Sequence, residues 1–139
     1  MLKRLLMPLF LLAVLASASV ASAARAKDAT GLWVTSMYGN TVECHLEQRG
    51  NYLFGVAYVT TRTGDHNTYH LAGVVQDGQV RAMHGAGHIF VGAFDGENHV
   101  SGQFTFKDGP TIALQAERVK RGITTPGGLQ WPAGLGPAQ

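Results

Sequence analysis

The sequence predicts an all-β protein, an eight-stranded antiparallel up-and-down meander that closes into a β-barrel. Seven turn signals divide residues 31–119 at short intervals, strand-like runs lie between them, and no run of ten residues has helical periodicity. Short connections make neighbouring strands antiparallel. Eight such strands are enough to close a barrel and leave no exposed sheet edge.

The first four predicted strands cover residues 31–38, 41–49, 52–60 and 67–76. Gly39-Asn40 and Gly50-Asn51 separate the first three, because Gly and Asn adopt the backbone conformations of tight hairpins. The longest loop, through Gly64-Asp65, separates the third strand from the fourth. These residues therefore form two tight hairpins and one longer connection.

The last four predicted strands cover residues 79–84, 88–95, 98–106 and 111–119. Their turns are Asp77-Gly78, Gly85-Ala86-Gly87, Asp95-Gly96 and Asp108-Gly109-Pro110. Each connection is short, so the meander continues to the last strand.

Hairpin register predicts which side chains face inward. If Gln76 pairs with Gln79, alternation places Val75 and Val80 on one face. This face stays apolar across all eight strands, and we interpret it as the barrel interior. It contains Trp33, Val42, Cys44, Leu46, Leu53, Gly55, Ala57, Val59, Leu71, Gly73, Val75, Val80, Ala82, His84, His88, Phe90, Gly92, Phe94, Val100, Gly102, Phe104, Phe106, Ile112, Leu114, Ala116 and Arg118.

The segments outside the barrel predict export. Residues 1–23 have the pattern of a signal peptide: two basic residues, an apolar run and small residues up to Ala23. The apolar run is shorter than the about 20 residues of a membrane-spanning helix, so we expect no membrane anchor. We expect a periplasmic or secreted protein with a lead-in at 24–30 and a disordered Gly/Pro-rich tail at 120–139.

Charge and cysteine content exclude several classes of protein. The chain has eleven basic and nine acidic residues, and removal of the signal peptide leaves nine of each. No basic stripe remains for nucleic acid, so we expect no nucleic-acid partner. The single cysteine, Cys44, excludes an intramolecular disulfide, and its predicted inward position indicates a small buried hydrophobe. No catalytic constellation is recognisable, so we do not expect an enzyme.

Gly31-Leu32-Trp33 on the first strand and Arg118 on the last resemble the calycin superfamily of lipocalin, fatty-acid-binding and avidin-type barrels. In that superfamily an arginine stacks across a tryptophan at the closed end. The meander, with its longest loop between strands three and four, looks most like the avidin type. The resemblance implies the fold and a small ligand, but not biotin, because Trp131 is the one tryptophan besides Trp33.

With Trp33 at the closed end, the open end carries the loops at residues 37–40, 60–67, 85–87 and 107–110. The predicted ligand-binding residues are Tyr69, His84, His88, His66, Phe90 and Phe104. Deeper inward positions hold small residues, which either leave volume for a ligand or ease barrel curvature while aromatic rings fill the interior. These small residues are Gly55, Ala57, Gly73, Ala82, Gly92 and Gly102.

His84 and His88 flank one tight turn, and three interpretations of this pair stay open. With His66 as a third ligand, the pair could bind a divalent transition metal. It could instead donate hydrogen bonds to an anionic or carbonyl head of a ligand. It could also be a solvated rim without a ligand.

The outer face of strands three to six is apolar, which predicts a homo-oligomer formed through the barrel wall. The residues concerned are Phe54, Val56, Tyr58, Ala72, Val74, Met83, Ile89, Val91 and Ala93. Together these patterns favour an exported barrel that binds a small, largely apolar molecule near His84 and His88. The alternative is a protein-binding barrel with a closed core, such as a protease inhibitor.

Overall fold

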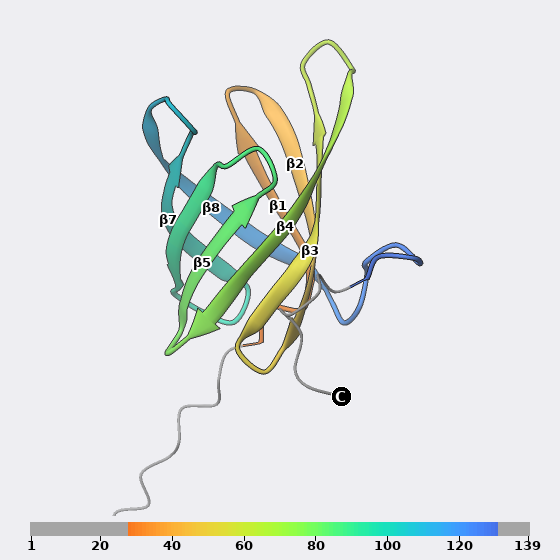
Figure 1. Cartoon of the computed structure of the whole chain (residues 1–139), viewed down its shortest axis with the longest axis vertical. Coiled ribbons are helices and arrows are strands. Elements are labelled where there is room, and N and C mark those ends of the chain that lie inside the picture. The colour runs from red at the N-terminus through yellow and green to blue at the C-terminus, as the bar shows by residue number, and fades with distance from the viewer. Residues whose placement is uncertain (1–27, 131–139) are drawn as a thin grey trace, which may run out of the picture.

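A computed structural model describes residues 28–130 of the chain as one closed antiparallel β-barrel (Figure 1). The strands are β1 (Gly31–Met37), β2 (Asn40–Arg49), β3 (Tyr52–Thr60), β4 (His66–Gln76), β5 (Gln79–His84), β6 (Ile89–Phe94), β7 (His99–Thr105) and β8 (Thr111–Arg121). Each strand pairs with the next, and β1 pairs with β8. The predicted all-β, eight-stranded meander is therefore confirmed. No helix capable of crossing a bilayer occurs in residues 28–130.

The hairpins have the register that the turn residues predict. Gln76 pairs with Gln79 across a turn in which Asp77 and Gly78 both have positive φ, 50° and 76°. Every strand begins and ends within two residues of its predicted range. The predicted signal peptide, residues 24–27 of the lead-in and residues 131–139 of the tail lie outside the described residues.

Four interior glycines let neighbouring strands approach closely. A Cβ at Gly55 would lie 2.0 Å from the carbonyl oxygen of His45, and one at Gly102 would lie 2.2 Å from that of Val91. A Cβ at Gly73 would lie 2.2 Å from the carbonyl oxygen of Arg81, and one at Gly92 would lie 2.5 Å from that of Ser101. These glycines therefore allow close packing of strands in the barrel wall, which does not decide between the two sequence interpretations.

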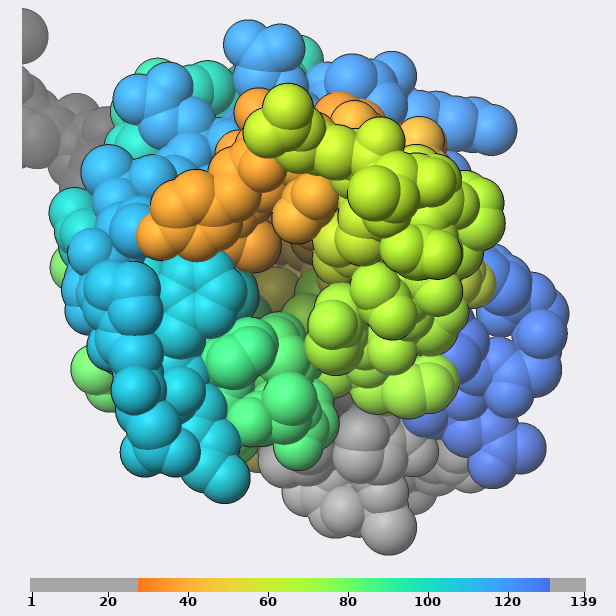
Figure 2. All heavy atoms as spheres, turned by 90° about the horizontal axis from the view of Figure 1, so that it is seen from above, coloured from red at the N-terminus to blue at the C-terminus, as the bar shows by residue number. Residues whose placement is uncertain are grey.

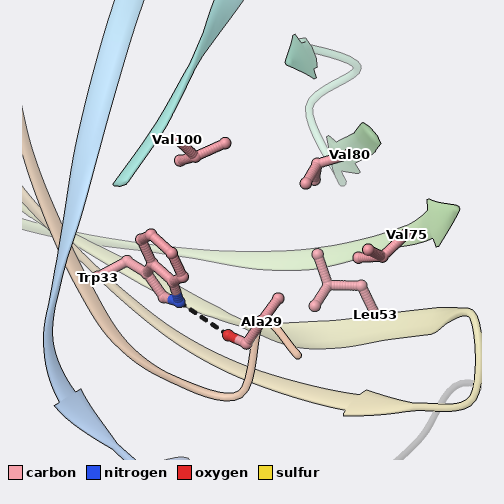
Figure 3. Close-up of a cluster of buried hydrophobic side chains, with 6 residues drawn as sticks. All are labelled: Ala29, Trp33, Leu53, Val75, Val80 and Val100. Atoms are coloured by element: carbon pink, nitrogen blue, oxygen red, sulfur yellow. Dashed lines mark hydrogen bonds between the residues drawn. The ribbon is translucent and has the colours of Figure 1, made fainter. Parts of the chain in front are cut away.

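The closed end of the barrel is built around Trp33, which is 3% exposed (Figure 3). Its indole Nε1 donates a hydrogen bond of 2.7 Å to the carbonyl oxygen of Ala29, and Ala29 itself is buried. The guanidinium of Arg118 lies 5.0 Å from the Trp33 ring, in the arrangement that the calycin resemblance implies. The buried cluster here comprises Ala29, Trp33, Leu53, Val75, Val80 and Val100.

The chain after β8 returns along the outer face of β2. Thr124 Oγ1 lies 3.0 Å from His45 Nδ1, and Thr125 Oγ1 donates to Glu47. In the β2–β3 ladder, His45 pairs with Val56 and Glu47 pairs with Phe54. Val56 and Phe54 are buried, at 1% and 5% exposure, although alternation turns them outward.

Burial of these two side chains reduces the apolar outer face that the sequence predicts. The large hydrophobic residues of that face that remain exposed lie on β4, β5 and β6: Val74, Met83, Ile89 and Val91. Self-association through the outer faces of β3 to β6 stays a prediction, with its exposed part on β4 to β6.

Candidate functional site

A cavity of about 300 Å³ occupies the barrel and opens at the end opposite Trp33. Seen from above, the β1–β2, β3–β4, β5–β6 and β7–β8 loops surround a central hollow (Figure 2). All eight strands contribute to the wall, and no Asp, Glu, Lys or Arg side chain lines it. The deep wall is apolar: Trp33, Leu46, Leu53, Val80, Phe94, Val100, Leu114 and Ala116.

Aromatic rings pack together near the mouth of the cavity. The ring centroids of Tyr69 and His84 are 4.7 Å apart, and those of His84 and His88 are 4.4 Å apart at nearly right angles. Phe106 lies 5.2 Å from His88 and 4.9 Å from Phe104. His84 is only 8% exposed, so a solvated rim does not describe its environment.

The β5–β6 turn positions the two histidines. His84 ends β5, His88 directly precedes β6, and the His84 amide donates to the His88 carbonyl at 3.2 Å. The Gly87 amide donates back to the His84 carbonyl at 2.8 Å, and Gly87 has a φ of 89° that favours glycine. The tight turn thus places both imidazoles on the inner face of adjacent strands.

Backbone amides determine the tautomers of both imidazoles. The Ala86 N–H donates to His84 Nδ1 at 3.1 Å, and the Lys107 N–H donates to His88 Nδ1 at 2.8 Å. An accepting Nδ1 carries a lone pair, so each neutral ring carries its proton on Nε2. Neither Nε2 has a hydrogen-bond partner within residues 28–130. Both residues line the cavity, and each carries an Nε2–H donor with no partner among the described residues.

Burial also favours the neutral form of His84. Loss of solvent lowers the pKa of His84 below its ordinary value, and the neighbouring His88 lowers it further. His84 therefore resists acquiring positive charge.

His66 does not line the cavity with this pair, so the structure does not bring the three predicted metal ligands together. β4 begins at His66, one residue earlier than predicted, and alternation with the cavity-lining Asn67 and Tyr69 turns His66 outward. His66 is exposed, and its Nδ1 lies 3.2 Å from Thr60 Oγ1. Within residues 28–130, no group of three His, Cys, Asp or Glu side chains could hold a metal ion.

The other predicted site residues, Tyr69, Phe90 and Phe104, all line the cavity. Sequence reasoning missed several further residues at the mouth: Tyr38, Asn40, Thr61, Asn67 and Phe106 as a site residue. Alternation from Tyr69 and Phe104 could have identified Asn67 and Phe106. Thr61 carries no such signal because it lies in the β3–β4 loop.

Cys44 forms part of the cavity wall on β2. Burial raises the pKa of its thiol to about 12, so the reactive thiolate is scarce at neutral pH. This environment suits a small hydrophobic wall residue better than a nucleophile, as the inward position on β2 predicts.

Neither a scan against protein-family models nor a search of the curated proteins found a match for this chain.

Proposed function

We propose that the protein is an exported binding protein that holds one small, largely apolar molecule inside its barrel. The observation that carries the proposal is the open cavity of about 300 Å³, whose lining contains no charged side chain. Ligand sites are typically concave, mainly apolar and equipped with a few polar groups, with volumes from about 300 Å³ upward. The cavity lies at the small end of this range.

The calycin resemblance supports the same function. An avidin-like or lipocalin-like barrel binds its ligand at the open end, and here Arg118 over Trp33 marks the opposite end. The expected site of export is the periplasm or the cell exterior, on the evidence of the signal-peptide pattern in residues 1–23.

The alternative of a protein-binding barrel has less support. A filled interior with a protruding lead-in or lid that could contact a partner would favour it. Ala29 instead packs against Trp33, and Arg118 donates hydrogen bonds to the carbonyl oxygens of Asp28 and Thr30. The described part of the lead-in is therefore attached to the barrel.

The proposal is tested by titrating the chain lacking residues 1–23 with N-phenyl-1-naphthylamine, an uncharged probe that fluoresces in apolar surroundings. We expect saturable binding with one probe per barrel. Ala82→Phe places a ring in the cavity and should weaken binding by about tenfold or more, because overpacking leaves less room for the probe.

Ala93→Phe is the matched control, because Ala93 is exposed on the outer face of β6. It should bind the probe like the parent protein. Equal weakening by both substitutions, or absence of saturable binding by the parent protein, would contradict the proposed function.

A further inference from the structure

We propose that the cavity selects molecules with one uncharged hydrogen-bond acceptor, such as the carbonyl oxygen of a ketone, aldehyde or ester, on an apolar body. Anions and hydrocarbons of the same shape as this ligand would bind less tightly than it does, and so would metal ions. This inference rests on the proposed function and specifies the ligand class of the same cavity.

The two histidines favour a ligand with a hydrogen-bond acceptor. His84 and His88 each use Nδ1 to accept a backbone N–H, which leaves two Nε2–H donors on rings 4.4 Å apart. Polar groups enclosed in proteins nearly always find hydrogen-bond partners. A carbonyl oxygen has two lone pairs and can accept from both donors at once. A hydrocarbon offers neither donor an acceptor, and the cost is greatest at His84, which is 8% exposed.

The cavity lining offers no positive charge to an anion. Protonation of either ring would place a new Nδ1–H against the backbone N–H of Ala86 or Lys107. The rim cations Arg62 and Lys107 do not line the cavity, and their side chains lie against Gly39 and Gly87. A carboxylate drawn into the cavity would therefore be desolvated without a countercharge, which is strongly unfavourable.

The hydrogen bonds of the two imidazoles also oppose metal binding. A metal binds imidazole through a nitrogen lone pair, and here the backbone N–H groups already occupy both Nδ1 lone pairs. Coordination through Nε2 would require each ring to change tautomer and lose its backbone hydrogen bond. The pair is therefore arranged to donate hydrogen bonds and not to coordinate a metal.

The distribution of polar groups also orients the ligand. Asn67, Tyr69, His84 and His88 line the cavity toward its mouth, whereas Leu53, Val80 and Val100 belong to the apolar cluster at the closed end. The apolar body of the ligand would enter first. Its acceptor oxygen would remain at the level of the histidines.

The test uses three molecules of one shape: 4-phenyl-2-butanone, butylbenzene and 3-phenylpropanoate. Each competes with N-phenyl-1-naphthylamine at pH 7.5. The ketone should bind about tenfold or more tighter than either of the others, the ratio expected when hydrogen bonds are made or left unmade.

His88→Phe and His84→Phe should each lower the ketone-to-butylbenzene affinity ratio, because each keeps a ring and removes one of the two donors. His66→Phe is the matched control and should preserve the ratio, since His66 faces outward. Preferential binding of 3-phenylpropanoate would overturn the inference. So would stoichiometric Zn²⁺ binding that His88→Phe abolishes.

A measurement on the unsubstituted protein covers the case in which His84→Phe fails to fold. The ¹⁵N chemical shifts of the imidazole rings distinguish protonated from unprotonated nitrogens. We expect Nε2–H tautomers for His84 and His88, and Nδ1–H tautomers would overturn the inference. Probe binding with equal affinities for the three competitors would refute this inference alone, whereas absence of probe binding would refute the proposed function.

Discussion

The two ends of the barrel differ in whether their side-chain N–H donors have hydrogen-bond partners. At the closed end, the Trp33 N–H reaches the Ala29 carbonyl, and Arg118 donates to the carbonyl oxygens of Asp28 and Thr30. At the open end, His84 and His88 accept backbone N–H groups and retain two N–H donors without partners within residues 28–130. Polar groups are satisfied at one end and available at the other.

This difference indicates that stability and binding are separable in this barrel. At the base, the Trp33 and Arg118 donors have backbone carbonyl partners. The open end keeps donors that only an added acceptor or solvent can satisfy. Substitutions at the base should therefore change mainly the free energy of unfolding, and those at the mouth mainly the choice of ligand.

The largest loss of stability is expected from a substitution at the closed end. Trp33→Ala removes a buried indole, its hydrogen bond to Ala29 and its contact with the Arg118 guanidinium. We expect the free energy of unfolding to fall by about 3–5 kcal/mol, as for other buried aromatic truncations. Urea denaturation measures this change. A loss below about 1 kcal/mol would show that the base is not a principal source of stability.

A smaller effect is expected in the wall that joins the two ends. Gly102→Ala puts a Cβ 2.2 Å from the Val91 carbonyl oxygen, which forces β6 and β7 apart. Overpacking of this kind costs about 1–3 kcal/mol. Thermal unfolding of Gly102→Ala is compared with that of Gly85→Ala, where the new Cβ meets nothing within 4 Å. Equal stability of the two variants would contradict the close approach of the strands.

The smallest expected effect is the contribution of His84, at the open end, to the pH dependence of stability. Because burial and His88 lower the pKa of His84 below its ordinary 6.5, the unfolded chain binds a proton at His84 more readily than the folded protein. This penalty is absent well above pH 6.5 and grows as the pH falls below it. The parent protein should therefore lose more stability than His84→Phe between pH 7.5 and pH 5.

Urea denaturation of both proteins at the two pH values measures this difference. The remaining histidines are common to both, including His99, which pairs with Asp95. Their contributions should largely cancel. An equal pH dependence in the two proteins would show that His84 titrates as it does in the unfolded chain.

Much of the fold could be predicted because it depends on local rules. Turn residues such as Asp77-Gly78 set the hairpin register, and alternation then assigns each side chain to one face of the wall. The same rules placed Tyr69, His84, His88, Phe90 and Phe104 in the barrel interior, where all five line the cavity.

His66 was expected in the loop above the mouth of the barrel, and the structure places it at the start of β4 instead. A strand has a side-chain period of two, so beginning β4 at His66 and not at Asn67 assigns His66 to the outer face. No turn signal marks the last residue of the long β3–β4 loop, and the pairing of His66 with Thr60 decides where β4 begins.

The sequence by itself determined the barrel, its register and its apolar interior, because turn chemistry and strand alternation act between neighbouring residues. Only the tertiary structure decided that Thr124 would cross β2 beside His45, that Gly102 would lie against Val91, and that the Lys107 amide would orient the His88 imidazole. The His88 tautomer depends on Lys107, nineteen residues away on another hairpin. Contacts between segments so far apart exist only after the barrel has closed.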